Sequence, residues 1–360
     1  MTSRIAAIVC LVLTFSAQHC LASKSALQAY LSQFVEEEGL PGAVLAVTAP
    51  SGNVVVTAGV AQVASKAPVR PETRFYIASS GKLMTSAAVL QLEQEGKFKL
   101  KDRASHLMDS FAGMSSIANI NRVTVEQLLK HRSGLVEYYN DSFESAAQKT
   151  PKKRWSVAES LSFIVHEEAN NEPGMSYDYV NSNYVLLGHL IATQNQSSYE
   201  QAIRQRLIGP LGLTNTTVGA QADEANLAHG YELKRNGGLK DVSYGGWSAI
   251  TGDGGIVTTA PDYDVFVRAL FSDYKVIGKG AVNRMCTRQR EEPDADYGLG
   301  CMIIRTRSGD AWGHNGSIAG FNAEAWYVPK LDVSIVLFAN GEFGADSVDI
   351  IQQVLKALRQ

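Results

Sequence analysis

Hydrophobic positions near the start of the chain repeat first with the period of a helix and then with that of strands. Apolar side chains three and four residues apart predict an amphipathic helix that ends near Gly39; they are Leu27, Tyr30, Leu31, Phe34 and Val35. Two β-rich runs, Gly42–Thr48 and Val54–Val60, flank a Pro-Ser-Gly-Asn turn at 50–53. This arrangement predicts a β-hairpin.

Strand patterns return near the other end of the chain. Gly298–Arg305, Glu324–Val328 and Val333–Ala339 have the apolar character of strands, and Ser347–Leu358 has the spacing of a helix. The long segment between the two strand regions is rich in helix and loop signals. Strands at both ends with helices between them predict one sheet built from both termini and a helical insertion.

The expected fold class is therefore α/β of the α+β type. A sheet lobe would combine residues of about 23–95 and 246–360, and a mainly helical lobe would take about 96–245. The sequence contains no internal repeat and no low-complexity tract, so we expect one interlocked unit after the N-terminal segment.

The first 22 residues differ in composition from the rest. Arg4 is their only charged residue, and the apolar run Ile5–Ser16 is short for a membrane span. Small residues follow near Cys20–Ala22, so 1–22 is predicted to be a secretory signal peptide and 23–360 a secreted or periplasmic mature domain. An uncleaved N-terminal anchor is the alternative. No later segment approaches the apolar length of a span, so we expect no stable membrane insertion.

The charge balance narrows the classes of partner. The 360 residues carry 33 Lys and Arg against 36 Asp and Glu, a net charge of −3, and 45% of them are hydrophobic. A basic nucleic-acid binder or a disordered acidic tail has a more extreme balance, so no nucleic-acid partner is expected. Outside the predicted signal peptide, Cys286 and Cys301 remain, either as a disulfide or as separate buried thiols. The sequence does not determine the oligomeric state.

Several catalytic and cofactor motifs are absent from the sequence. It has no G-x-S-x-G nucleophile elbow, no Walker loop and no G-x-G-x-x-G after a strand. The seven His residues show no paired ligand spacing. We therefore expect neither a metal nor a cofactor.

The first candidate chemistry is a Ser-Ser-Gly-Lys sequence at 79–82. Ser79 and Lys82 are three positions apart at the start of a helical pattern, so their side chains would share one helix face. An amine whose pKa is lowered by burial can take the proton of a serine hydroxyl and make it nucleophilic. A serine N-cap followed by a solvated lysine is the alternative. Ser80 is a rival nucleophile, but its spacing to Lys82 is unfavourable.

A second candidate element contains Tyr179 and Asn181, two positions apart in a loop before a helical pattern. The phenol can relay a proton, and the amide can contact a substrate carbonyl and a lysine together. A tyrosine-rich turn without a catalytic role is the alternative. The neighbouring Tyr177 and Tyr184 are expected to be packing residues.

The third candidate element is His-Asn-Gly-Ser at 314–317, before a strand-like run through Ala325. Gly316 would let a substrate backbone lie against a strand edge, and the Ser317 N–H could join that of Ser79 in an oxyanion hole. His314 could donate a hydrogen bond to a substrate, with a charge that varies near neutral pH. A strand-edge histidine without a role is the alternative.

In this order, the Ser-x-x-Lys, Tyr-x-Asn and His-x-Gly elements resemble those of the penicillin-recognising serine hydrolases related to class C β-lactamases and serine D-alanyl-D-alanine carboxypeptidases. The resemblance runs from about Leu27 to the C-terminus and includes further stretches; these are Thr124–Leu135, Pro210–Leu213, Gly254–Asp262 and Tyr297–Gly300. It implies an antiparallel sheet flanked by helices, with an inserted helical lobe and the active site between them.

The resemblance also implies catalytic roles. Ser79 would be acylated, with Lys82 and Tyr179 jointly moving its proton, and Asn181 would hold the substrate amide. The N–H groups of Ser79 and Ser317 would form the oxyanion hole.

His314 stands where β-lactamases of this class carry lysine, which argues against efficient β-lactam hydrolysis. Above its pKa, a histidine is a weaker anchor than lysine for a substrate carboxylate. His131, in one of the matching stretches, is predicted to tie a loop together through hydrogen bonds. Tyr138 and Tyr139 follow it and either line the cleft or are buried.

The implied function is that of a secreted acyl-serine hydrolase, most closely a D-alanyl-D-alanine carboxypeptidase-like peptidase. Its substrate would be a small molecule or peptide containing D-amino acids. An esterase or β-lactamase of the same family is the alternative enzyme. A non-catalytic receptor for penicillin or peptidoglycan fragments is the alternative of another class.

Overall fold

The computed structural model describes residues 23–150, 153–219, 224, 226–235, 237–243, 251–289 and 296–360. The predicted signal peptide, residues 1–22, lies outside them. Within these ranges, no helix has the length and apolar character that a membrane crossing needs.

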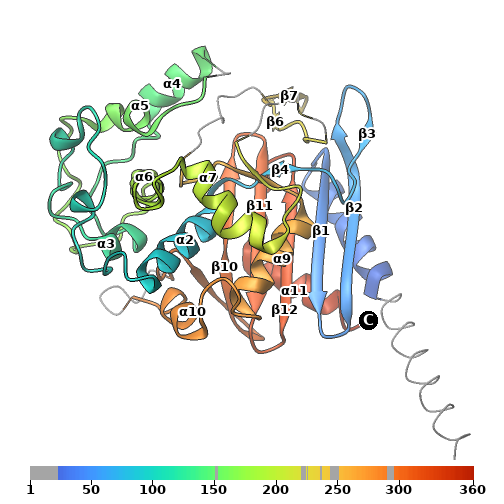
Figure 1. Cartoon of the computed structure of the whole chain (residues 1–360). Helices are drawn as coiled ribbons and strands as arrows, with labels where there is room; N and C mark the ends of the chain where they lie inside the picture. Colours follow the sequence, from blue (N-terminus) through green and yellow to red (C-terminus); the bar gives the residue numbers. More distant parts are fainter. Residues whose placement is uncertain are drawn as a thin grey trace, which may run out of the picture.

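A seven-stranded antiparallel sheet joins the two ends of the chain, in the order β3-β2-β1-β12-β11-β10-β9 (Figure 1). The strands are β1 (Gly42–Ala49), β2 (Gly52–Gln62), β3 (Ala67–Pro68), β9 (Met302–Thr306), β10 (Gly309–Ile318), β11 (Phe321–Val328) and β12 (Val333–Ala339). The first long strand pairs with the last, with Ala43 opposite Ala339. This pairing confirms the prediction of one sheet built from both ends of the chain.

Both faces of the sheet are covered by helices. On one face, a helix over residues 23–37 and α11 (Ser347–Ala357) pack against alternate positions of the central strands, among them Leu45 and Ile335. On the other face, Val44 and Ala46 belong to the core that includes α2 (Lys82–Gln94) and α9 (Ala260–Phe271). Because both faces are buried, β1 and β12 are apolar at almost every position.

The remaining helices lie mainly beside the sheet, and α3 to α6 form a helical region to its left in Figure 1. The α-helices are α3 (Val125–Leu129), α4 (Asp141–Lys149), α5 (Val157–Leu161), α6 (Ser182–Asn195), α7 (Tyr199–Ile203), α8 (Gly209–Leu211) and α10 (Lys279–Met285). The other helical turns are η1 (Ala78–Gly81), η2 (Ala104–His106), η3 (Met114–Ser116), η4 (Ser162–Ile164) and η5 (Arg204–Ile208). Helix α6 packs against α2, which connects this region to the sheet.

Short strands form two further small sheets, and some of them lie in the segment whose patterns indicated helices and loops. One sheet has the order β4-β8-β5, and the other pairs β6 with β7. Their bounds are β4 (Phe75–Tyr76), β5 (Thr217–Val218), β6 (Tyr231–Leu233), β7 (Leu239–Asp241) and β8 (Ile256–Thr258).

The structure corrects the strand predictions near residue 314. The His-Asn-Gly-Ser element lies inside β10 rather than before a strand, and the strand predicted from Gly298 begins at Met302. Glycine, aspartate and asparagine have low strand propensity, which hides β10 in the sequence. Pairing with β9 on one side and β11 on the other makes this segment a strand.

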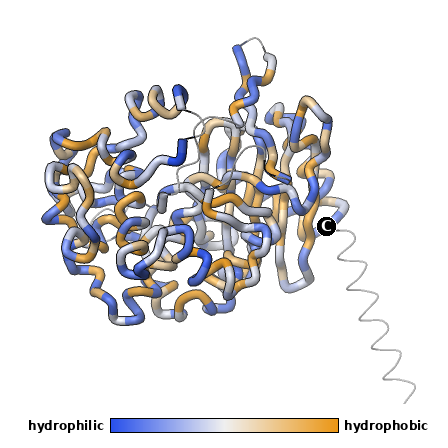
Figure 2. Tube along the Cα trace, turned by 45° about the horizontal axis from the view of Figure 1, so that its top comes forward, coloured by the Kyte–Doolittle hydropathy of each residue, from blue (hydrophilic) through white to orange (hydrophobic). Residues whose placement is uncertain are grey.

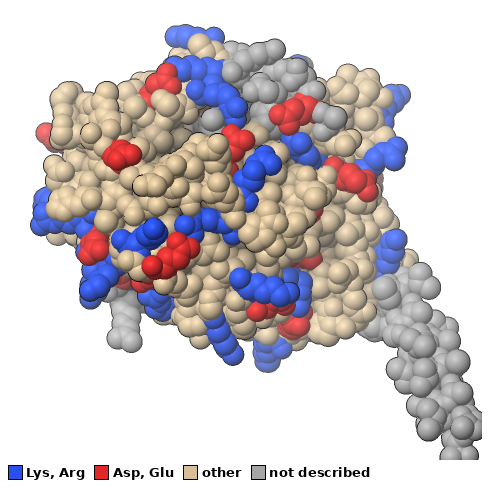
Figure 3. Space-filling view, viewed as in Figure 1, with Lys and Arg blue, Asp and Glu red and all other residues tan. Residues whose placement is uncertain are grey.

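Hydropathy varies along the chain with the secondary structure, and charges of both signs are mixed on the surface. Figure 2 shows hydrophobic positions running along the strands and through the helical region, with hydrophilic positions gathered at turns. On the face seen in Figure 3, acidic and basic side chains are interspersed.

Cys286, after α10, and Cys301, before β9, form a disulfide with their Cα atoms 5.3 Å apart. Of the two alternatives for these cysteines, the structure has the disulfide.

A buried carboxyl group joins β11 to α11. Glu324 is 4% exposed. It accepts hydrogen bonds from the Trp326 indole N–H and from the Ser347 hydroxyl at the start of α11. Burial raises the pKa of Glu324 from 4.5 to about 7.

This raised pKa makes the stability of the fold depend on pH. Between pH 4.5 and 7 the folded state keeps a proton on Glu324 that the unfolded state releases, so stability falls as pH rises through this window. The free energy of unfolding is expected to fall by about 3 kcal/mol across this pH window. Urea unfolding at pH 5 and pH 8 should show that Glu324→Gln lacks this contribution and gains relative to the original chain at pH 8. If the free energy of unfolding changed equally with pH in the two proteins, the raised pKa of Glu324 would be contradicted.

Candidate active site

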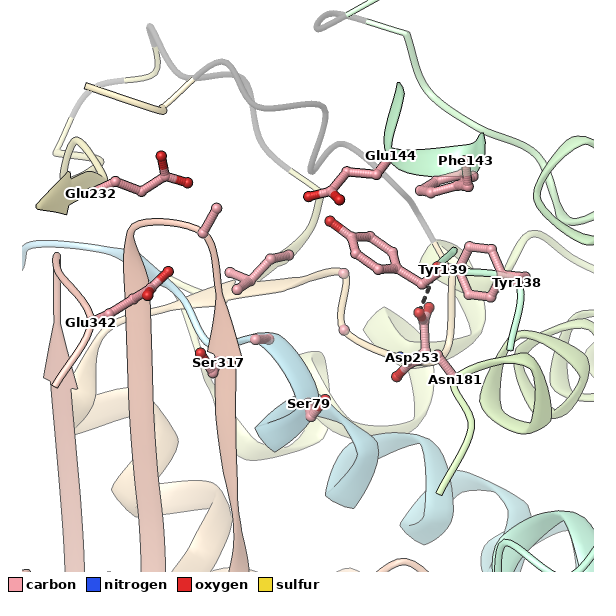
Figure 4. Close-up of a pocket in the computed structure, with 15 residues that line it drawn as sticks. Ser79, Tyr138, Tyr139, Phe143, Glu144, Asn181, Glu232, Asp253, Ser317 and Glu342 are labelled. Atoms are coloured by element: carbon pink, nitrogen blue, oxygen red, sulfur yellow. Dashed lines mark hydrogen bonds between the residues drawn. The ribbon is translucent and has the colours of Figure 1, made fainter. Parts of the chain in front are cut away.

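A cleft opens between the end of β10 and the start of α4, and Ser79 lies at its floor (Figure 4). The cavity has a volume of about 310 Å³. Ser79 belongs to η1, directly before α2. Asn181 and Ser317 also line this cavity, so residues from all three candidate elements meet there.

The backbone around Ser79 is packed tightly against β10. A Cβ atom on Gly316 would lie 2.3 Å from the Ile77 carbonyl oxygen and 2.9 Å from the Ser79 nitrogen. Only glycine permits this approach. The missing side chain of Gly316 therefore allows η1 to pack against β10. The sequence had instead suggested that it leaves space for a substrate backbone. The next residue, Ser317, does reach the cleft.

Lys82 is fully buried and donates three hydrogen bonds. Its Nζ lies 2.8 Å from Ser79 Oγ, 2.7 Å from Asn181 Oδ1 and 2.8 Å from the Asp253 carbonyl oxygen. Burial lowers the pKa of Lys82 to about 8, against the opposing effect of the negative charges on Asp253 and Glu137. A neutral amine is therefore accessible near physiological pH, at hydrogen-bond distance from the serine hydroxyl.

Tyr179 lies beside this pair. The Lys82 Nζ is 5.1 Å from the centre of its ring. Among the described residues, its buried hydroxyl has no partner with hydrogen-bond geometry. Burial raises the pKa of Tyr179, and the nearby Ser79 hydroxyl only partly opposes this. The phenol thus stays protonated at neutral pH and can donate its proton.

His131 holds the tyrosine loop, as predicted. Its Nδ1 accepts a hydrogen bond of 3.2 Å from the Val180 N–H. Its ring stacks on Tyr179 at 4.2 Å and on Tyr184 at 5.1 Å between ring centres. Burial and the charge of Lys82 lower the pKa of His131 well below its usual range, so the ring is a neutral packing element.

The structure contradicts the expected charge behaviour of His314. Its side chain is fully buried, and burial together with the Lys82 charge lowers its pKa to about 3. The ring hydrogen-bonds to the Tyr297 hydroxyl at 3.1 Å and to the Asn315 carbonyl. His314 is therefore neutral near pH 7, and it is not among the described residues that line the cleft. Its role in substrate binding stays a prediction.

The other residues singled out in the sequence have clear positions. Ser80 is buried, and its hydroxyl donates to the His314 carbonyl, away from the cleft. Tyr184 is a packing residue whose hydroxyl contacts Ser86 and the Leu129 carbonyl. Tyr138 and Tyr139 both line the cleft, and Tyr138 is also 2% exposed.

Sequence reasoning missed Glu137 and Asp253. The carboxylate of Glu137 accepts hydrogen bonds from Asn181, and that of Asp253 accepts from the Tyr138 hydroxyl at 2.7 Å, the dashed contact in Figure 4. Neither acid has a motif of its own. Their positions next to the matching stretches at 124–135 and 254–262 were the only available signal. In the described ranges, no group of three or more His, Cys, Asp or Glu could hold a metal ion.

Comparison with known proteins identifies the family. The Beta-lactamase family model matches residues 27–359. The chain belongs to the β-lactamase family. Members of this family are serine hydrolases, and the sheet flanked by helices is the fold they share.

Individual relatives of this β-lactamase-family chain include amide hydrolases. It is 27% identical to the D-stereospecific amidohydrolase from Streptomyces sp., with a TM-score of 0.76 over 94% of this chain and 97% of that one. It is 26% identical to the D-aminopeptidase of Brucella anthropi over 90% of this chain, but spans only 61% of that protein. The penicillin-binding protein from Bacillus halodurans shares the fold, with a TM-score of 0.79, 23% identity and coverage of 90% and 98%.

The position of Ser79 predicts that it is the nucleophile. Ser79→Ala should lower turnover of a p-nitrophenyl ester by a factor of roughly 10⁴ or more. Intact-protein mass spectrometry of this variant with the ester should show no acyl adduct. Ser80→Ala, the matched control, should keep turnover within about threefold and lose about 1 kcal/mol of stability, because only its buried hydrogen bonds to the His314 carbonyl and the Tyr263 hydroxyl are removed. Equal losses in the two variants, or turnover retained by Ser79→Ala, would contradict the assignment.

The lowered pKa of Lys82 predicts a pH profile. If its neutral form takes the Ser79 proton, kcat/KM should rise tenfold per pH unit up to about pH 8 and level off above it. His131 and His314 cannot produce this limb, since the pKa of each is well below 6.5. A flat profile between pH 6 and pH 8 would exclude Lys82 as the titrating base.

Proposed function

We propose that this chain is a serine hydrolase that forms an acyl-enzyme on Ser79 and cleaves amide bonds in substrates containing D-amino acids. The observation that carries the proposal is the buried Lys82 amine, 2.8 Å from the Ser79 hydroxyl. Burial prepares this amine to accept a proton, and the hydroxyl that would lose the proton lines a cleft of substrate size.

The proposed reaction has two halves. Neutral Lys82 takes the proton of Ser79 as Oγ bonds to the substrate carbonyl carbon, and the Ser79 and Ser317 N–H groups stabilise the resulting oxyanion. The C–N bond then breaks, and the leaving amine receives a proton through Tyr179. Water attacks the acyl group by the same proton path and releases the acid and free Ser79.

Charge in the cleft favours one direction of substrate binding. The charged side chains that line it, among those described, are all acidic: Glu144, Glu232, Asp253 and Glu342. Figure 4 shows the three glutamates around the opening, from α4, from β6 and from the segment after β12. A carboxypeptidase must bind a substrate carboxylate, which these groups repel, whereas they attract a free amine.

We therefore propose a D-aminopeptidase or D-amino-acid amidase as the activity of this site. The D-aminopeptidase and D-stereospecific amidohydrolase among its relatives support this choice. The D-alanyl-D-alanine carboxypeptidase-like activity suggested by the motifs is the second candidate, because the Ser-x-x-Lys and Tyr-x-Asn elements are equally suited to it.

The choice can be tested with matched substrates. D-Phenylalanine amide should be hydrolysed with a kcat/KM at least about tenfold above that of its N-acetyl derivative, which corresponds to about 1.4 kcal/mol of favourable charge interaction. The L-amide is the stereochemical control. Faster release of D-alanine from N-acetyl-D-alanyl-D-alanine would favour the carboxypeptidase. A stable penicillin adduct on Ser79 without turnover of any substrate would favour the receptor.

A further inference from the structure

Glu137 contacts Asn181 and is not itself among the described residues that line the cleft. Its Oε2 accepts hydrogen bonds from the Asn181 backbone N–H at 2.6 Å and from the Asn181 side-chain Nδ2 at 3.1 Å. Its Oε1 accepts the Tyr139 N–H at 2.8 Å. One carboxylate thus connects the loop before α4 to the start of α6.

The carboxylate can determine which way the Asn181 amide points. An amide has a donor end and an acceptor end of nearly the same shape, and the Lys82 ammonium can bind only the oxygen. Glu137 can bind only the NH₂ group. If the amide were reversed, oxygen would face carboxylate and NH₂ would face ammonium, and both contacts would be lost. Glu137 and Lys82 therefore select one orientation from opposite sides.

Glutamine cannot replace this arrangement fully. Its side chain has a single acceptor end, whereas the two oxygens of Glu137 face N–H donors in different directions. In Glu137→Gln, an NH₂ group would replace the acceptor either of the Tyr139 N–H or of the two Asn181 donors, so the side chain would hold the Asn181 amide less firmly.

The negative charge of Glu137 also faces Lys82. The titratable groups around Lys82 are the carboxylates of Asp253 and Glu137, the phenols of Tyr179 and Tyr184, and the imidazoles of His131 and His314; of these, only the two carboxylates raise its pKa. Removing one carboxylate would make the amine easier to deprotonate but leave it less well oriented.

We propose that Glu137 is a positioning residue that holds the Asn181 amide with its oxygen on Lys82 and its nitrogen away from it. The inference rests on the proposed acyl-enzyme function of the same site. Glu137 acts through Asn181, because it does not itself line the cleft in which the substrate would bind.

A double-mutant cycle tests this coupling. The rate of Ser79 labelling by a fluorophosphonate reports nucleophilicity without a choice of substrate. Glu137→Gln and Asn181→Ala should each slow labelling by roughly 10- to 100-fold. In the Asn181→Ala background, Glu137→Gln should add less than about threefold, because the group it orients is gone. Losses that multiply would overturn the proposal.

Two controls separate positioning from general damage. Glu168→Gln makes the same change at an exposed carboxylate that is not among the described cleft residues, and it should leave labelling within about twofold. Glu137→Asp keeps the charge on a shorter side chain and should recover part of the rate lost in Glu137→Gln. Circular dichroism of each variant confirms that it is folded. Equal losses in the Asp and Gln variants would overturn a role for the carboxylate.

A second readout does not need catalysis. In the resting protein, ¹⁵N NMR of the Asn181 side-chain NH₂ group, assigned with Asn181→Ala, should show that Glu137→Gln shifts this signal, because the NH₂ group loses its carboxylate acceptor. An unchanged signal would overturn the proposal. If Ser79 of the original chain is not labelled but this signal still shifts in Glu137→Gln, the proposed hydrolase function fails while the positioning by Glu137 stands.

Discussion

The buried ammonium of Lys82 is the interaction on which the rest of the site depends. A charge without water is tolerated only when each of its protons has an acceptor, and here Ser79, Asn181 and Asp253 supply the three. These acceptors come from η1, from the residue before α6 and from the turn before β8. Satisfying one side chain therefore brings together three segments that are distant in the sequence.

The two acceptors that are far from Lys82 in the sequence, Asn181 and Asp253, make further hydrogen bonds that hold them in place. Asn181 is bonded to Glu137, and the Asp253 side chain accepts from the hydroxyls of Tyr138 and Thr251. The carbonyl oxygens presented to Lys82 are thus oriented before any substrate arrives. Such preorganisation is how an active site avoids reorganising its dipoles during the reaction.

Aromatic rings pack beside Lys82, which is fully buried. His131 stacks between Tyr179 and Tyr184, while His314 bonds to Tyr297. Both histidines are neutral because they are buried and lie near the Lys82 charge. Lys82 therefore remains the titrating amine beside Ser79, and the opening of the cleft carries carboxylates. This charge distribution is the physical basis for proposing an amine-bearing substrate.

The sequence by itself determined the features that depend on neighbouring residues. The amphipathic helix before Gly39, the hairpin at 42–60 and the shared face of Ser79 and Lys82 follow from local periodicity and spacing, and the structure contains each of them. The order of the three motifs was sufficient to predict the family and the overall architecture, because those residue types recur at fixed spacing. Tertiary structure decided what depends on distant partners. Strand β10 forms because two strands pair with it, Gly316 is required because η1 packs on it, and Glu137 matters because Asn181 folds against it. A lone acid or a glycine-rich strand has no local signal, since its energy comes from contacts made only when the chain has folded.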